Sequence, residues 1–391
     1  MDTQNTPIHI RLWHRDFWLL AIVNLLMSTI VYMQLSALGN AMTFNDGDGL
    51  RTIEQALIIG IYGLGIFILG PYCHYLLQRY RRKRVCQLSV AAMALMSIVV
   101  SLAASKMHGY PLFVTCLLGM FWYGAFFGLA QMIISSTLVI DITESAQRTE
   151  ANYTSAWFRR FAIAIGPLLT IVAPVSRIEE PVILWFYVAI LLLISIIRIP
   201  FKSPDDNGHV FCFDRFIMPQ GIHLTLNLLP VTVVLGMSVA MAFHNEIFFI
   251  QLALGLALAL LAEIFVFVNA DLQSEFISGG ILITGALLLY IFRSGMPVVE
   301  HLAPVLIGIG SGLIGGRMQL FFNKLAHHCQ RGTAQSSFFL SWELGIAIGF
   351  FLALWLVDFH LLDCIGLVLI VFALLLYHFY THPWYLKHKN R

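Results

Sequence analysis

Hydrophobic residues in this chain gather in long runs separated by short polar stretches. A membrane-spanning helix needs about 20 mainly apolar residues. Twelve runs approach or exceed that length, and they cover residues 17–39, 53–77, 85–105, 111–140, 151–175, 182–200, 219–240, 247–268, 276–292, 300–325, 333–357 and 361–380. The first run exceeds the ~7–15 residues of a signal-peptide core, so it predicts an uncleaved span. The pattern predicts an all-α membrane protein with twelve transmembrane helices and both termini on one side.

The longest polar stretch, residues 201–218, falls between the sixth and seventh runs. It divides the chain into an N-terminal six-helix bundle (1–200), a cytoplasmic linker (201–218) and a C-terminal six-helix bundle (219–391). Short motifs recur across this division, which predicts two six-helix pseudo-repeats. The matched positions are Asn24 with Asn227, Gly124 with Gly312, Gln131 with Gln319, and Ile163 with Ile346.

Composition and charge support a membrane location. The chain is 59% hydrophobic and 11% charged, where a soluble domain has about 25% charged residues. Of its 23 lysines and arginines, 16 fall in loops on the side of the termini and 4 on the other side. Because basic loops stay in the cytoplasm, we expect a multi-pass protein of the cytoplasmic (inner) membrane with both termini cytoplasmic. The basic residues form no single patch, so no nucleic-acid partner is expected.

No enzymatic or metal-binding signature is present. The six cysteines lack disulfide or metal spacing. The run His327-His328-Cys329 has no fourth ligand nearby. The chain contains no phosphate-binding loop, nucleophile elbow or zinc motif. These absences argue against a primary pump and a membrane hydrolase, and we expect no cofactor and no enzymatic activity.

Two motifs carry a resemblance to the major facilitator superfamily. The loop between the second and third runs holds Gly70 and a basic cluster at 79–84, while His74 stands where that family has an acidic residue. The fifth run contains Gly166-Pro167, the centre of a motif found in proton-coupled exporters. The resemblance implies a twelve-helix transporter with two halves that rock around a central cavity.

The resemblance also implies roles for individual residues. A gating loop would comprise Gly70, Arg79, Arg81 and Arg82. Solute-binding residues would be Asn24, Gln131, Asn227 and Gln319, on helices that line the cavity in that family, together with Arg159. Interhelical hydrogen bonding is the alternative role for the four amides. The expected partners are the lipid bilayer, a small-molecule solute and protons as coupling ion, with the protein acting as a monomer.

Five ionisable residues lie inside the predicted spans, namely Arg159, Arg160, Glu263, Arg317 and Glu343. Such groups are costly in a membrane and need partners or water. We expect an arginine of the fifth helix to pair with Glu263, and Arg317 to pair with Glu343. Two interpretations stay open for Glu343, Arg317, Glu263 and Arg160. They are a proton-coupling site, or fixed ion pairs that orient helices.

The sequence therefore predicts a secondary active transporter of a small organic solute, proton-coupled and working by alternating access. Export is slightly favoured, on the Gly166-Pro167 motif. The alternatives are proton-coupled uptake of a nutrient such as a sugar or organic acid, and a non-transporting receptor or assembly factor with a transporter-like fold.

Overall fold

The computed structural model describes residues 11–44, 52–144, 146–172, 181–199, 209–268, 270–271, 273–293, 295–327 and 330–389. Within them every regular element is a helix, which confirms the all-α prediction. The N-terminal helices are α1 (Arg15–Phe44), α2 (Thr52–Gly60), α3 (Tyr62–Ile68), α4 (Gly70–Arg79), α5 (Arg82–Lys106), α6 (Gly109–Ile133), the π-helical turn η1 (Ile134–Leu138), α7 (Val139–Asp141), α8 (Arg148–Val172) and α9 (Pro181–Ile196).

The C-terminal helices begin with the 3-10 turn η2. They are η2 (Pro219–Gly221), α10 (Ile222–Met241), α11 (Glu246–Phe265), α12 (Ser274–Arg293), α13 (Pro297–Leu325), α14 (Arg331–Leu356), α15 (Phe359–Leu376), the π-helical turn η4 (Tyr377–Thr381) and α16 (His382–His388).

Ten helices of the described chain are long and apolar enough to cross a membrane, and α2 to α4 supply an eleventh span if they count as one. The predicted sixth span corresponds to α9, which has 16 residues. At ~1.5 Å per residue that helix rises about 24 Å, less than the roughly 30 Å of a hydrocarbon core. A multi-pass helical protein is therefore established, while the count of twelve spans stays a prediction.

The second predicted span, 53–77, is not the single straight helix that its apolar run suggests. The helix bends by 47° between Ile68 and Gly70. Pro71 lies in the first turn of α4. Because proline has no N–H to donate to the carbonyl four residues earlier, the hydrogen-bond ladder breaks at this point.

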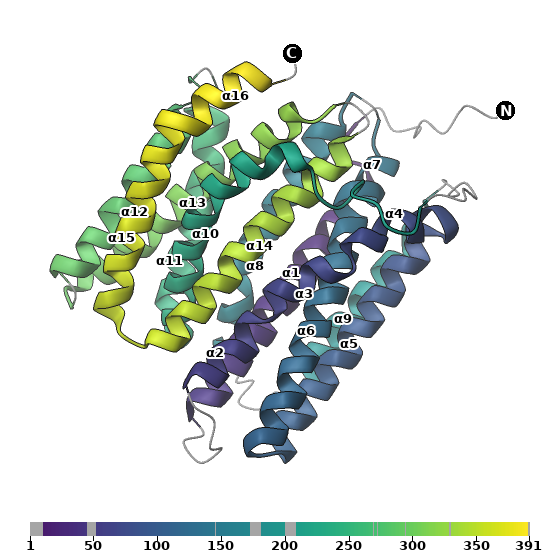
Figure 1. Ribbon diagram of the computed structural model, residues 1–391, viewed down its shortest axis with the longest axis horizontal. Coiled ribbons are helices and arrows are strands. Elements are labelled where there is room, and N and C mark those ends of the chain that lie inside the picture. Colours follow the sequence, from purple (N-terminus) through teal and green to yellow (C-terminus); the bar gives the residue numbers. More distant parts are fainter. Residues whose placement is uncertain are drawn as a thin grey trace.

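The helices form two neighbouring groups (Figure 1). Helices up to α9 gather on one side and helices from α10 onward on the other, and α1 begins at the same end of the bundle at which α16 ends. We call this the terminal end. The packing partners correspond between the groups, since α1 contacts α8 and α9 whereas α10 contacts α14 and α15. Likewise α5 packs on α6, and α12 packs on α13. The superposition of the two groups as a repeat stays a prediction.

Contacts between the groups are concentrated on two helices. From the C-terminal group, α14 packs against α2, α3 and η1, and from the N-terminal group α8 packs against α11 and α13. Four of the five charged residues predicted inside the membrane lie at this interface, namely Arg159, Arg160, Glu263 and Glu343.

Candidate functional site

Two adjacent arginines of α8 lie at the interface between the groups. Arg159 and Arg160 are 4% and 2% exposed. Arg160 donates from Nη2 to the Gly315 carbonyl at 2.9 Å and to Oε1 of Gln319 at 2.6 Å, both on α13. Its guanidinium lies 4.6 Å from the ring centroid of Trp157, one turn earlier on α8. The two buried guanidinium groups thus contact both groups of helices. Neither guanidinium has a direct carboxylate partner in the described chain.

The carboxylate of Glu263, on α11, faces the same part of α8. It accepts hydrogen bonds from the Tyr153 hydroxyl and from Nε1 of Trp157, the latter at 3.2 Å. Arg160 is near enough for its charge to act on Glu263, but the described side chains form no direct ion pair. The expected arginine–Glu263 pair is therefore wrong as a contact, because two aromatic donors of α8 occupy the carboxylate instead.

Glu343, on α14, is 0% exposed. Both of its oxygens lie 3.1 Å from the hydroxyl of Tyr32 on α1, which donates to them. Tyr62 of α3 lies beside the same carboxylate without hydrogen-bond geometry. Arg159 supplies the neighbouring positive charge and packs over Phe339, with 4.9 Å to the ring centroid. A carboxylate of the C-terminal group is thus enclosed by residues of the N-terminal group.

The expected pair between Arg317 and Glu343 is wrong. Arg317 of α13 instead binds Glu275 in the first turn of α12, with 2.7 Å between Nε and Oε2 and a second contact through Nη2. Both helices belong to the C-terminal group, so this ion pair joins neighbours within the group. Glu275 lies one residue before the predicted ninth span, and for that reason sequence reasoning missed it.

The predicted solute-binding amides all make interhelical hydrogen bonds. Asn24 donates to the backbone and hydroxyl of Ser155 and accepts from Gln131 at 2.5 Å, which links α1, α8 and α6. Gln319 donates to the Asn152 carbonyl at 3.1 Å and to Gln335 at 2.9 Å. Asn227 donates to the Ala373 carbonyl of α15, within the C-terminal group. Solute binding by these residues stays a prediction.

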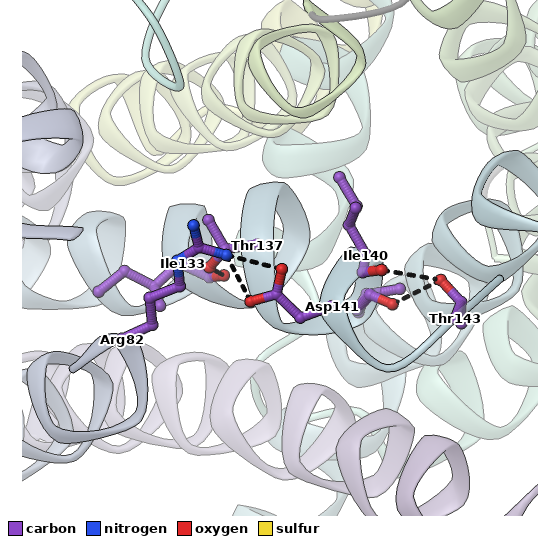
Figure 2. Close-up of polar contacts among 7 residues, drawn as sticks. Arg82, Ile133, Thr137, Ile140, Asp141 and Thr143 are labelled. Atoms are coloured by element: carbon purple, nitrogen blue, oxygen red, sulfur yellow. Dashed lines mark hydrogen bonds and ion pairs between the residues drawn. The ribbon is translucent and has the colours of Figure 1, made fainter. Parts of the chain in front are cut away.

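The predicted gating loop lies at the terminal end. Arg82 is buried and donates from Nη1 to both oxygens of Asp141 at the end of α7, each at 2.6 Å. Figure 2 shows Arg82 reaching across to Asp141, beside Thr137 of the π-helical turn. Arg79 lies over the ring of Tyr75 in its own helix and donates to the Tyr75 hydroxyl at 2.7 Å, and Arg81 is exposed. Among the predicted loop arginines, Arg82 alone therefore has a buried carboxylate partner.

An acidic residue from the linker occupies the space next to His74. Oδ2 of Asp214 lies 3.0 Å from Nδ1 of His74. Its other oxygen accepts from the hydroxyl of Thr333 in the first turn of α14, at 2.8 Å. Gly70 makes room for Phe216, whose ring fills the position that a Cβ would take. The linker thus contacts both α4 and α14 at the terminal end.

Several residues of the site were not visible as candidates in the sequence. Tyr32, Tyr153 and Trp157 count as apolar in a hydropathy pattern, yet each donates a hydrogen bond to a buried carboxylate. One signal was present, because positions 153, 157 and 160 share a helical face. The described residues bring together no group of three or more metal ligands, and His328 and Cys329 lie outside the described residues.

Comparisons with known proteins bear on the fold. No protein-family model and no curated protein matches the chain in sequence. A mutant of the nucleoside transporter NupG is 12% identical at a TM-score of 0.66, over 96% of this chain and 100% of that one. A bacterial homologue of the iron transporter ferroportin, in the outward-facing state, is 15% identical at 0.68, over 95% and 99%. The human organic anion transporter MFSD10 (TETRAN) is 14% identical at 0.66, over 93% and 99%.

Identities this low establish the fold alone. Over nearly its whole length the chain has the fold of the major facilitator superfamily transporters, as its sequence motifs predicted.

Proposed function

We propose that this protein is a proton-coupled secondary transporter of a small organic solute that works by alternating access. Residues 1–200 and 219–391 form the two moving bundles, and residues 201–218 form a cytoplasmic linker. Both termini face the cytoplasm from the inner membrane, and the monomer is the working unit. The fold of the solved transporters supports this proposal, as do the polar contacts that join α8 and α1 to the C-terminal helices.

The observation that carries the coupling proposal is the setting of Glu343. Its carboxylate is fully buried, it accepts hydrogen bonds from Tyr32 of the opposite group, and Arg159 faces it. When the groups separate on one side, the carboxylate loses both neighbours. Because an unpaired charge in a low-dielectric site is costly, protonation of Glu343 accompanies the separation. Arg159, and not Arg317, is then the positive partner of Glu343, and protonation of the carboxylate ends the attraction between them.

Export is the direction we favour. Gly166, from the exporter-type Gly166-Pro167 motif, lies against α1, and a Cβ on Gly166 would stand 2.7 Å from the Cβ of Tyr32. The absence of a side chain at Gly166 therefore lets α1 lie close to α8, and α1 carries the Tyr32 that contacts Glu343. An amphipathic organic anion is the solute class that suits the buried guanidinium of Arg159 and its aromatic neighbours Phe338 and Phe339.

Reconstitution into proteoliposomes tests the proposal. Purified protein is assayed with a panel of organic anions under an imposed proton gradient, with an internal pH dye to follow proton movement. We expect gradient-driven solute transport that Glu343→Gln abolishes, while solute exchange without a gradient persists. Glu300→Gln, which removes an exposed carboxylate on α13, is the matched control.

The outcomes separate the alternatives. Transport at the wild-type rate in Glu343→Gln assigns the coupling site elsewhere and leaves Glu343 a structural residue. Gradient-driven accumulation only in the inward direction favours nutrient uptake over export. No transport of any solute, from protein that is folded and correctly inserted, favours a receptor or assembly factor.

A further inference from the structure

A second polar site lies at the terminal end, in a cavity of about 260 Å³ enclosed by N-terminal helices, the linker and the start of α14. The charged residues that line it are Arg82, Asp141, Arg148, Asp214, Arg215 and Arg331. Four arginines against two aspartates leave two positive charges without compensation among the described lining residues. None of these residues belongs to the Glu343 site.

The two aspartates of the cavity are already engaged. Asp141 accepts both of its hydrogen bonds from Arg82, at 2.6 Å. Asp214 binds His74 through one oxygen and Thr333 through the other. The cavity therefore holds no uncommitted carboxylate in the described chain for its other arginines.

Two of those arginines carry buried donors without partners. Nε of Arg148 and Nη1 of Arg215 are inaccessible to solvent and make no hydrogen bond in the described structure. The nearest carboxylate contact of Arg215 is Oδ2 of Asp214, at 4.0 Å from Nε. Buried polar groups are nearly always hydrogen-bonded, so each exception calls for an explanation. A bound ion that accepts the hydrogen bond is one such explanation.

The backbone holds Arg215 in this position at a cost. Its φ is 59°, in the left-handed region that non-glycine residues seldom adopt. Its N–H donates to the hydroxyl of Thr333 at 2.8 Å, which fastens the linker to α14. Burial, and then the neighbouring charge of Arg82, lower the pKa of Arg215. Strained residues of this kind concentrate at functional sites.

We propose that this cavity binds a phosphate-type anion, either free phosphate or the phosphomonoester headgroup of an anionic lipid. Guanidinium groups match phosphate oxygens in paired hydrogen bonds, and a dianion would neutralise the two excess charges. The start of α14, which contributes Arg331 to the lining, adds the positive end of its helix dipole. With a water molecule occupying about 30 Å³ of liquid, the cavity has room for a phosphate group and several waters. The bound anion bridges α8 and α14 and so holds the terminal end closed.

Calorimetric titration of the purified full-length protein with inorganic phosphate tests this proposal, with ionic strength held constant by chloride. We expect binding by the wild type, and binding at least about tenfold weaker for Arg148→Gln and for Arg331→Gln, since each loses charge-assisted hydrogen bonds. Arg84→Gln removes an exposed arginine of α5 and should bind like the wild type. Arg331→Lys keeps the charge without the paired donors and should fall between.

A second arm separates the two sources of the anion. The same proteins are assembled in phosphatidylcholine nanodiscs with or without phosphatidic acid, and retained lipid is measured by native mass spectrometry. Phosphate binding that depends on Arg148 and Arg331 supports a free anion. Arginine-dependent retention of phosphatidic acid without phosphate binding supports the lipid headgroup. Absence of both, or binding that the glutamine variants leave unchanged, overturns the proposal. Neither measurement involves transport, so the result is independent of the proposed function.

Discussion

The ion pair between Arg317 and Glu275 offers a direct test of how charge is used inside this protein. The two side chains are 11% and 6% exposed, and Nε lies 2.7 Å from Oε2. At that distance two unit charges attract by about 6 kcal/mol at an effective dielectric constant of about 20. Desolvation of both ions offsets most of that attraction, so the intact pair contributes little net stability. Removing one partner is different, because the other charge stays buried without compensation.

Arg317→Met should therefore cost about 3–5 kcal/mol in the free energy of unfolding. With roughly 2 °C per kcal/mol for a larger protein, the midpoint of thermal unfolding in detergent should fall by roughly 6–10 °C. The double variant Arg317→Met/Glu275→Leu should recover the wild-type midpoint or exceed it, because an apolar pair of similar size packs without a desolvation cost. Arg293→Gln, an exposed change at the other end of α12, should leave the midpoint unchanged.

The same double variant separates structural from coupling roles. If the pair only joins α12 to α13, the double variant transports under a proton gradient at close to the wild-type rate. Loss of gradient-driven transport in a double variant of normal stability would refute this reasoning and return Arg317 to the coupling machinery. An Arg317→Met midpoint within 1 °C or so of the wild type would show that the pair is not buried in the working protein.

Three further predictions follow from close contacts and topology. Gly166→Ala should destabilise the protein by about 1–3 kcal/mol, because the new Cβ would press on α1. Gly285→Ala, the control, places a Cβ with nothing within 4 Å and should be neutral or stabilising. Thermal unfolding of the two variants checks both expectations. Asp214→Asn removes the charge that the linker places next to His74 of α4. The variant should raise the rate of maleimide labelling at buried Cys73, at most about fivefold for a partly exposed pair. A cysteine that replaces Gln78 should not be labelled by membrane-impermeant reagents added to the periplasmic side. Labelling would show that the loop is periplasmic and that the expected topology is wrong.

The positions of most helices were predictable because lipid imposes a strict rule on composition. The run over 111–140, for example, corresponds to the continuous helical segment from Gly109 to Asp141. Its π-helical turn and the bend at Pro71 were not predicted. Both features depend on which backbone N–H finds which carbonyl, and an apolar run carries no information on that choice.

Rarity in an apolar helix was enough to single out the charged residues. The partners of Arg317 and Glu343 were nevertheless predicted wrongly, and the reason lies in α14. Every residue from Gly332 to Glu343 is buried. A helical stretch that is covered on all sides has no exposed polar stripe, so its sequence does not show its rotation. Without the rotation, Glu343 is as easily assigned to α13 as to α1.

The burial of this whole stretch of α14 is also the structural argument for the proposal that the coupling acid lies on α14. The helix packs on α10 on one side and on α2, α3 and η1 on the other, so it lies between the two groups of helices. No rearrangement of one group against the other leaves the contacts of α14 unchanged. Glu343 is the acidic residue buried within this helix, and its hydrogen-bond donor, Tyr32, belongs to the opposite group. Any motion that opens the interface at this depth therefore takes Tyr32 away from Glu343. The coupling proposed for Glu343 requires that the charge state of the carboxylate respond to this motion.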